Sequence, residues 1–298
     1  MATSIRASST VDRPRERAFR HPLAVAARLR RNKIGMAGSL VLLVMFAAAG
    51  LAGALVPYDP NAADLTTVLS PPTLAHPFGL DNLGRDIFAR VIYGGRISLL
   101  IGFFAVALGA FVGVPLGVCS GFYGGAADAL IQRIVDLMLA FPGFLLALTL
   151  ISLLGVGFTN VVLSVGIASV PVYVRLVRGV TLSVRELTYV ESGRAAGLPD
   201  WAIMVRYVLP NAAAPIIVQS SLQLGAALLT AAGLGFLGLG VTPPTPEWGA
   251  MLGEAQTYLL TTWYMATFPG LAIFIAVMAF NLLGDGLRDA LDPRMKVL

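Results

Sequence analysis

Five long stretches without a charged side chain constrain the fold of this chain more than any other feature of its sequence. A helix that spans a bilayer needs about 20 mostly apolar residues. The third stretch is long enough for two such helices and contains a turn signal at 155–157, so we divide it there. The uncharged stretches are residues 34–58, 97–127, 137–174, 207–246 and 255–284.

The sequence therefore predicts an all-α, polytopic membrane bundle. Six transmembrane helices are expected, at residues 34–56, 97–119, 130–153, 160–182, 211–238 and 264–287. The composition agrees, because 57% of the residues are hydrophobic and only 12% are charged, whereas a soluble domain carries about 25% charged residues.

The few remaining polar residues exclude several classes of function. Cys119 is the only cysteine, and His21 and His76 are the only histidines, so no disulfide within one chain and no metal site is expected. The net charge is +5. Because the basic residues flank apolar runs, they indicate orientation in a lipid membrane better than they indicate binding to nucleic acid.

Lys and Arg predict which ends of the helices face the cytoplasm. If the N-terminus is cytoplasmic, six spans place both termini inside, together with 18 of the 21 basic residues. Only Arg85, Arg90 and Arg96 then lie outside, as the positive-inside rule favours. Residues 57–95 and 241–262 become long outer segments, which we expect to fold as caps over the outer face.

The inner segment 183–210 reads SVRELTYVESGRAAGLPDWAIMVRYVLP. It predicts a short helix, a sharp bend at Gly197-Leu198-Pro199-Asp200, and a second helix that ends at Leu209-Pro210. Asp200 is expected to cap the second helix. A projection of this kind suits docking of another protein, although an interfacial amphipathic helix is an equally good explanation from the residues alone.

This segment resembles the cytoplasmic EAA loop of permeases in bacterial ATP-binding-cassette (ABC) importers. The pattern is Glu-Ala-Ala, three residues, Gly, nine residues, Ile, one residue, Leu-Pro. Glu191, Gly197, Leu209 and Pro210 match it. Ser192 and Gly193 replace the alanines and stay small, whereas the bulkier Tyr207 replaces the isoleucine.

Other motifs extend the resemblance over residues 25–295. The run His76–Asp86, the Gly- and Leu-rich run 235–240, residues 243–248, and the run 281–289 are similar to the oligopeptide, dipeptide and nickel permease family, in its second-permease branch. The resemblance implies a type I ABC importer permease fold in the bacterial cytoplasmic (inner) membrane. It also implies a second homologous permease, two cytoplasmic ATPases and an extracytoplasmic solute-binding protein as partners.

The resemblance divides the chain and assigns its sites. Residues 1–33 would be a basic cytoplasmic tail, 34–95 a first helix with an outer segment, 96–287 the five-helix core, and 288–298 a cytoplasmic tail. The expected ATPase-coupling residues are Glu191, Ser192, Gly193, Arg194, Gly197, Asp200, Leu209 and Pro210. The expected contacts with the binding protein are Asp81, Arg85, Asp86, Glu247 and Trp248. For Asp81, Arg85 and Asp86, a structural turn with local hydrogen bonds is an equal alternative.

The energy source is expected to lie in a partner. The only lysines are Lys33 and Lys296, and neither follows a glycine, so the chain lacks a GxxxxGK[ST] nucleotide-binding loop. We therefore expect a transport subunit rather than an enzyme, without a cofactor of its own, and ATP and Mg on partner ATPases. Di- or oligopeptides, or glutathione-like peptides, are the expected cargo. The alternatives are nickel, an ion-coupled carrier and a membrane enzyme.

Three intramembrane features allow two interpretations each. Arg133 and Asp136 could form a local ion pair or extend toward the interface by snorkelling, or they could form a gate. Pro142 and Pro171 could be simple kinks or points about which the bundle rocks. Glycines recur every four residues from Gly109 to Gly125, which indicates close helix packing or a moving interface.

Overall fold

A computed structural model describes residues 28–30 and 32–291 of the chain. Most of the predicted tail 1–33, and residues 292–298 of the predicted tail 288–298, lie outside the described residues. The described part is helical and contains no strand; Leu80 and Asp86 form an isolated β-bridge. The helices are α2 (Lys33–Gly50), α3 (Ala52–Leu55), α4 (Ile87–Tyr123), α5 (Gly125–Leu139), α6 (Gly143–Leu154), α7 (Phe158–Arg185), α8 (Thr188–Ala195), α9 (Asp200–Ile203), α10 (Leu209–Phe236), α11 (Trp248–Ala255) and α12 (Tyr264–Leu291).

Five of the six predicted spans correspond to long apolar helices in the structure. Those helices include α2, α4, α7 and α12, and the fifth runs from residue 200 through α10. The division at Gly155–Gly157 is confirmed, because α6 ends at Leu154 and α7 begins at Phe158. The span predicted at 130–153 is interrupted at Pro142, where the sequence analysis allowed a kink. α5 and α6 meet there at an angle of 90°, as in a broken span or a re-entrant loop.

Prolines act differently in the two helices that were expected to kink. Pro142 immediately precedes α6, where its ring fits the start of a helix better than the interior. It therefore marks a break. Pro171 lies inside α7, which continues for 28 residues around it.

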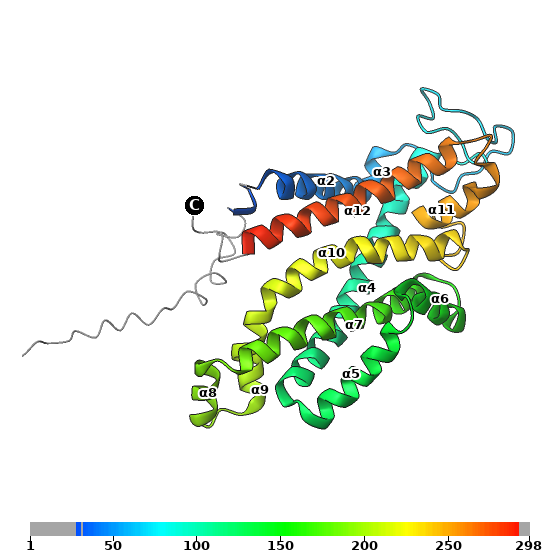
Figure 1. Cartoon of the computed structure of the whole chain (residues 1–298). Helices are drawn as coiled ribbons and strands as arrows, with labels where there is room; N and C mark the ends of the chain where they lie inside the picture. The colour runs from blue at the N-terminus through cyan, green and yellow to red at the C-terminus, as the bar shows by residue number, and fades with distance from the viewer. Residues whose placement is uncertain (1–27, 31, 292–298) are drawn as a thin grey trace, which may run out of the picture.

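The bundle has two functional ends (Figure 1). α8 and α9 lie at one end, the same end at which α2 begins and α12 ends, although well apart from both. The opposite end carries α3, α11 and the irregular residues 56–86, so the two segments expected to form caps, 57–95 and 241–262, gather at this end. Asn32 confirms that the two ends of the described chain meet, because its side-chain amide donates to Asp289 at 2.8 Å.

A seam of glycines holds α4 against α7. A Cβ added at Gly113 would lie 2.6 Å from the Cβ of Tyr173, and one added at Gly117 would lie 2.8 Å from the carbonyl oxygen of Val174. Such distances leave no room for a larger residue. Lipid gives helices no hydrophobic reason to associate, so close backbone packing of this kind stabilises the pair.

Candidate functional site

The segment between α7 and α10 folds as a helix, a bend and a second helix, as predicted. α8 ends in a Schellman motif: Gly197 N–H donates to the Arg194 carbonyl at 2.9 Å, and Leu198 N–H donates to the Gly193 carbonyl at 3.1 Å. Gly197 has φ of +77°, in the left-handed region that favours glycine. The bend therefore depends on Gly197, as the matched glycine of the pattern suggested.

The second half of the segment differs from the prediction. The helix does not end at Leu209-Pro210; α9 passes through a π-helical turn at Met204–Val208 directly into α10. Asp200 is not the N-cap. Pro199 occupies that position, and Asp200 is the first residue of α9. Its carboxylate still lies in the first turn, where the positive end of the helix dipole stabilises its negative charge.

One face of the segment is buried and the other is exposed. Val190, Gly193, Ile203 and Val208 are buried against the bundle. The predicted coupling residues Glu191, Ser192, Arg194, Gly197, Asp200 and Pro210 are exposed, and Leu209 is half-buried. The exposed face also carries two large apolar side chains that the sequence analysis missed, namely Trp201 (67% exposed) and Val205 (56% exposed).

Two of the three residues that depart from the EAA pattern, Gly193 and Tyr207, lie next to each other. A Cβ added at Gly193 would lie 3.2 Å from Cε2 of Tyr207. The Tyr207 ring also packs near that of Tyr189, with 5.7 Å between centroids. The bulk gained at Tyr207 therefore occupies space that an alanine at 193 would need.

The segment is attached to the end of α4 by two arginines. Arg194 of α8 places its guanidinium 5.0 Å from the ring centroid of Phe122. Arg185, the last residue of α7, donates to the Gly121 carbonyl at 2.8 Å. Both cations lie near the negative end of the α4 dipole, which favours them.

The five residues expected to contact a binding protein are all buried at the opposite end. Asp81, Arg85, Asp86, Glu247 and Trp248 are each at most 4% exposed. Their burial opposes direct contact in this conformation, and the structural alternative fits Asp81, which accepts from the Leu83 and Arg85 N–H groups at 2.9 Å each.

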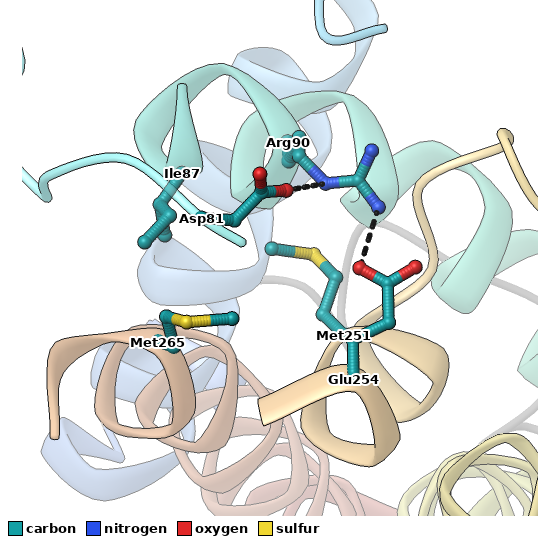
Figure 2. A pocket seen from close by; sticks show the side chains of 6 residues that line it. All are labelled: Asp81, Ile87, Arg90, Met251, Glu254 and Met265. Carbon is teal, nitrogen blue, oxygen red and sulfur yellow. Dashed lines mark hydrogen bonds and ion pairs between the residues drawn. The ribbon is translucent and has the colours of Figure 1, made fainter. Parts of the chain in front are cut away.

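Charges inside this outer cap compensate one another. Arg85 bonds both Asp81 and Glu254 at 2.6 Å. Arg90 lies between the same two carboxylates, at 3.5 Å and 3.4 Å, in a small pocket that Met251 and Met265 also line (Figure 2). The sequence analysis did not identify Arg90 or Glu254, because their partners come from segments distant along the chain.

Glu247 fixes α11 to α4. Its carboxylate accepts from the N–H groups of Gly249 and Ala250 at 2.8 Å each, which makes it the N-cap, and from Ser98 Oγ at 3.0 Å. Burial raises the pKa of the Glu247 carboxyl, and these three hydrogen bonds oppose that shift. Trp248 completes the joint by donating from its indole nitrogen to the Val91 carbonyl at 2.8 Å.

The expected local pair of Arg133 and Asp136 is absent from the described structure. Asp136 instead pairs with Arg175 of α7 at 2.8 Å, and both side chains are more than half exposed. Arg133 is exposed. The spacing along α5 did not reveal the partner on another helix.

Comparison with known proteins identifies the class to which this architecture belongs. Residues 113–297 match the family described as "Binding-protein-dependent transport system inner membrane component", and residues 15–72 match "N-terminal TM domain of oligopeptide transport permease C". The chain belongs to the first of these families, the inner-membrane permeases of ABC importers. Such permeases operate with ATPase and binding-protein subunits.

Relatives within the family are similar over most of the chain. The chain is 48% identical to "Glutathione transport system permease protein GsiD" of Pectobacterium atrosepticum, over 90% of each protein. It is 47% identical to the protein of the same name from Escherichia coli O6:K15:H31, over 90% of this chain and 89% of that one.

Solved structures show the same fold at low identity. An inward-facing MetNI methionine ABC transporter matches with a TM-score of 0.58 and 18% identity, over 69% of this chain and 98% of that one. An amino acid ABC transporter matches with a TM-score of 0.52 and 15% identity, over 67% and 94%. The fold is therefore that of a type I ABC importer permease.

Proposed function

We propose that this chain is one of two homologous permeases in an importer that takes short peptides, glutathione among them, into the bacterial cytoplasm. Two partner ATPases bind ATP and Mg and supply the energy. The proposal of this cargo is based on the high sequence identity to glutathione permeases over nearly the whole chain. The orientation rests on the Lys and Arg distribution, which places α8, α9 and both termini in the cytoplasm.

The observation that carries the coupling mechanism is the exposed face of the segment 186–208. Glu191 and Arg194 supply charges there, and Trp201 supplies an apolar anchor. Exposed tryptophans are typical of positions that dominate binding energy in interfaces. Docking of this face into an ATPase groove would let closure of the ATPases on ATP move α8 and α9, and through them α7 and α10, so that the pathway opens alternately to the two sides.

The outer cap is the proposed docking surface for a solute-binding protein. The buried residues Asp81, Arg85, Asp86, Glu247 and Trp248 would hold its shape rather than make the contact. An open groove of about 630 Å³ lies on this cap between α3, the start of α4 and the loop before α11, and its walls include Tyr58, Tyr93 and Arg96.

The test is ATP-dependent uptake by proteoliposomes that hold the complete complex. Glutathione, a dipeptide and nickel are supplied in turn with the binding protein and ATP. Uptake of glutathione or dipeptide is expected, and uptake of nickel alone would replace the proposed cargo. Absence of ATP-dependent uptake of all three would overturn the peptide assignment.

The same preparation tests the coupling face. Trp201→Ala is expected to weaken binding of the ATPases by about 30-fold, which corresponds to the roughly 2 kcal/mol of a hot-spot residue. Trp263→Ala is the matched control, because Trp263 is 58% exposed and lies at the opposite end, just before α12. Equal effects of the two substitutions on ATPase affinity would contradict the assignment of this face.

A further inference from the structure

α5 is held to the rest of the bundle by few contacts. Val135 is its only buried residue. With Ile131 and Met138 it forms a small apolar cluster against Val170 and Val174 of α7. At its C-terminal end α5 meets the 90° bend into α6. A helix packed so lightly depends on polar contacts for its position.

One carboxylate near the start of α5 makes those contacts. Asp128 accepts from Nε and Nη2 of Arg178 at 2.7 Å each, so the guanidinium binds both carboxylate oxygens. Ser120 of α4 donates to the same carboxylate, and Gln132 donates to Ser120 Oγ at 2.9 Å. Side chains of α4, α5 and α7 thus converge on Asp128. Bidentate charged bonds of this kind fix geometry as well as adding energy.

The junction lies directly beside the attachment of the coupling segment. Arg185 follows Arg178 by two turns of α7 and bonds Gly121, the residue after Ser120. Arg194 of α8 covers Phe122, one residue further. Consecutive residues of α4 therefore contact α5 through Ser120, α7 through Gly121 and α8 through Phe122.

We infer that the Asp128–Arg178 pair is a positioning pair for transport, which transmits movement of the coupling segment to α5 and the broken span. The inference rests on the proposed function of the segment 186–208. The pair does not touch cargo or nucleotide in this role. It determines whether α5 follows α7 when α8 is displaced.

A second ion pair between the same two helices supplies the matched control. Asp136 and Arg175 also join α5 to α7 at 2.8 Å, but their side chains are 59% and 56% exposed. Those of Asp128 and Arg178 are 20% and 32% exposed. The Asp136–Arg175 pair is more exposed and joins through one contact rather than two, so it is expected to contribute less to the position of α5.

The experiment compares Asp128→Asn, Arg178→Gln, their double variant and Asp136→Asn in the reconstituted complex. The readout is glutathione or dipeptide transported per ATP hydrolysed, with basal ATPase activity measured alongside. Asp128→Asn and Arg178→Gln are each expected to lower that ratio by roughly 2- to 30-fold, the range for residues that carry coupling between sites. The double variant is expected to be no worse than the worse single one, because both remove the same contact.

The outcomes separate this inference from the proposed function. Normal coupling in Asp128→Asn, or an equal loss in Asp136→Asn, would overturn it. Arg178→Lys keeps the charge but loses the bidentate geometry, and a partial loss is expected. If Asp128→Asn fails to assemble while Arg178→Lys assembles and couples fully, the pair is structural only and the inference is also overturned. Failure of the unaltered complex to transport would instead count against the proposed function.

Discussion

Gly193 and Tyr207 show how two unusual residues explain each other. Each departs from the EAA pattern, and the added-Cβ distance of 3.2 Å places them in direct contact. The backbone at Gly193 is helical, so glycine is not needed there for an unusual φ. Its lack of a side chain instead leaves room for the Tyr207 ring. Crowding at this point would displace Tyr207 or Leu198, whose Cδ1 would lie 3.4 Å from the added Cβ.

A double-mutant cycle tests this compensation. Gly193→Ala alone should crowd the ring, and Tyr207→Ile alone should leave a gap. The double variant should be more stable than the sum of the single effects predicts, with an interaction energy of about 0.5–3 kcal/mol, as for other residues in contact. Thermal unfolding of the purified complex provides the measurement, and additivity of the two effects would show that the contact is not tight.

At the scale of elements, the seam between α4 and α7 leaves no room for side chains where its glycines meet the facing helix. Gly113 meets backbone as well as side chain, since an added Cβ would lie 2.8 Å from the Val170 carbonyl oxygen and 2.6 Å from Tyr173. Neither neighbour is a flexible chain end that could move aside. The two helices would have to separate to admit a methyl group.

Gly113→Ala is therefore expected to destabilise the protein by about 1–3 kcal/mol, the usual cost of overpacking. Gly179→Ala on α7 is the control, because an added Cβ there meets nothing within 4 Å. Alanine should be neutral or stabilise by up to about 1 kcal/mol at that helical position. The measurement is the unfolding temperature of each variant in detergent. Equal unfolding temperatures for the two variants would show that the α4–α7 contact is not tightly packed at Gly113.

Hydropathy predicted where most spanning helices lie, but it could not predict the bend between α5 and α6. The apolar run continues across Phe141 and Pro142, so hydropathy averaged over a window of residues indicates a single helix. The direction of α6 is set by tertiary packing, since Ala147 and Ile151 are buried in the cluster that contains Val161 and Val165 of α7.

The candidate site was predictable to a similar extent. The run Gly197-Leu198-Pro199-Asp200 predicted the bend, because local sequence determines it, whereas Glu191 was singled out by the resemblance to the EAA loop. Partners of charged residues were not predictable, since Asp136 bonds Arg175 and Arg85 bonds Glu254 across long sequence separations. The exposure of Trp201 depends on how α9 continues into α10, which the sequence analysis placed incorrectly.

Across the whole molecule, charged residues have different roles at the two ends. Around α8 and α9 they lie on the surface, available to another protein. In the cap, by contrast, one cluster of charged residues is removed from water and satisfied within the chain: Asp81, Arg85 and Arg90 are at most 3% exposed. Desolvated charges of this kind are costly unless every partner is present. The cap therefore depends on these ion pairs for order, whereas in our proposal the charges around α8 and α9 serve recognition of the ATPases.

Arg85→Leu tests this difference between the ends. Removing Arg85 leaves Arg90, at the longer distances, as the only cation that pairs with Asp81 and Glu254 among the described residues, and loss of one partner from a buried pair costs about 3–5 kcal/mol. The cap should loosen, so stimulation of ATP hydrolysis by the binding protein should fall while basal hydrolysis persists. Gln256→Ala is the control, because Gln256 is exposed on the cap but does not line its groove, and surface substitutions change stability by about 0.5 kcal/mol or less.

Whether the two ends act separately is decided by which function each substitution impairs, and less by how large the loss is. Arg85→Leu acts at the end that faces the solute-binding protein in our proposal, so ATPases should still bind the complex with normal affinity. Trp201→Ala acts at the other end and should reduce that affinity whether or not binding protein is present. If Arg85→Leu weakened ATPase binding as strongly as Trp201→Ala, damage to the cap would spread through the whole bundle. The two ends would then form one cooperative unit rather than two separable docking surfaces.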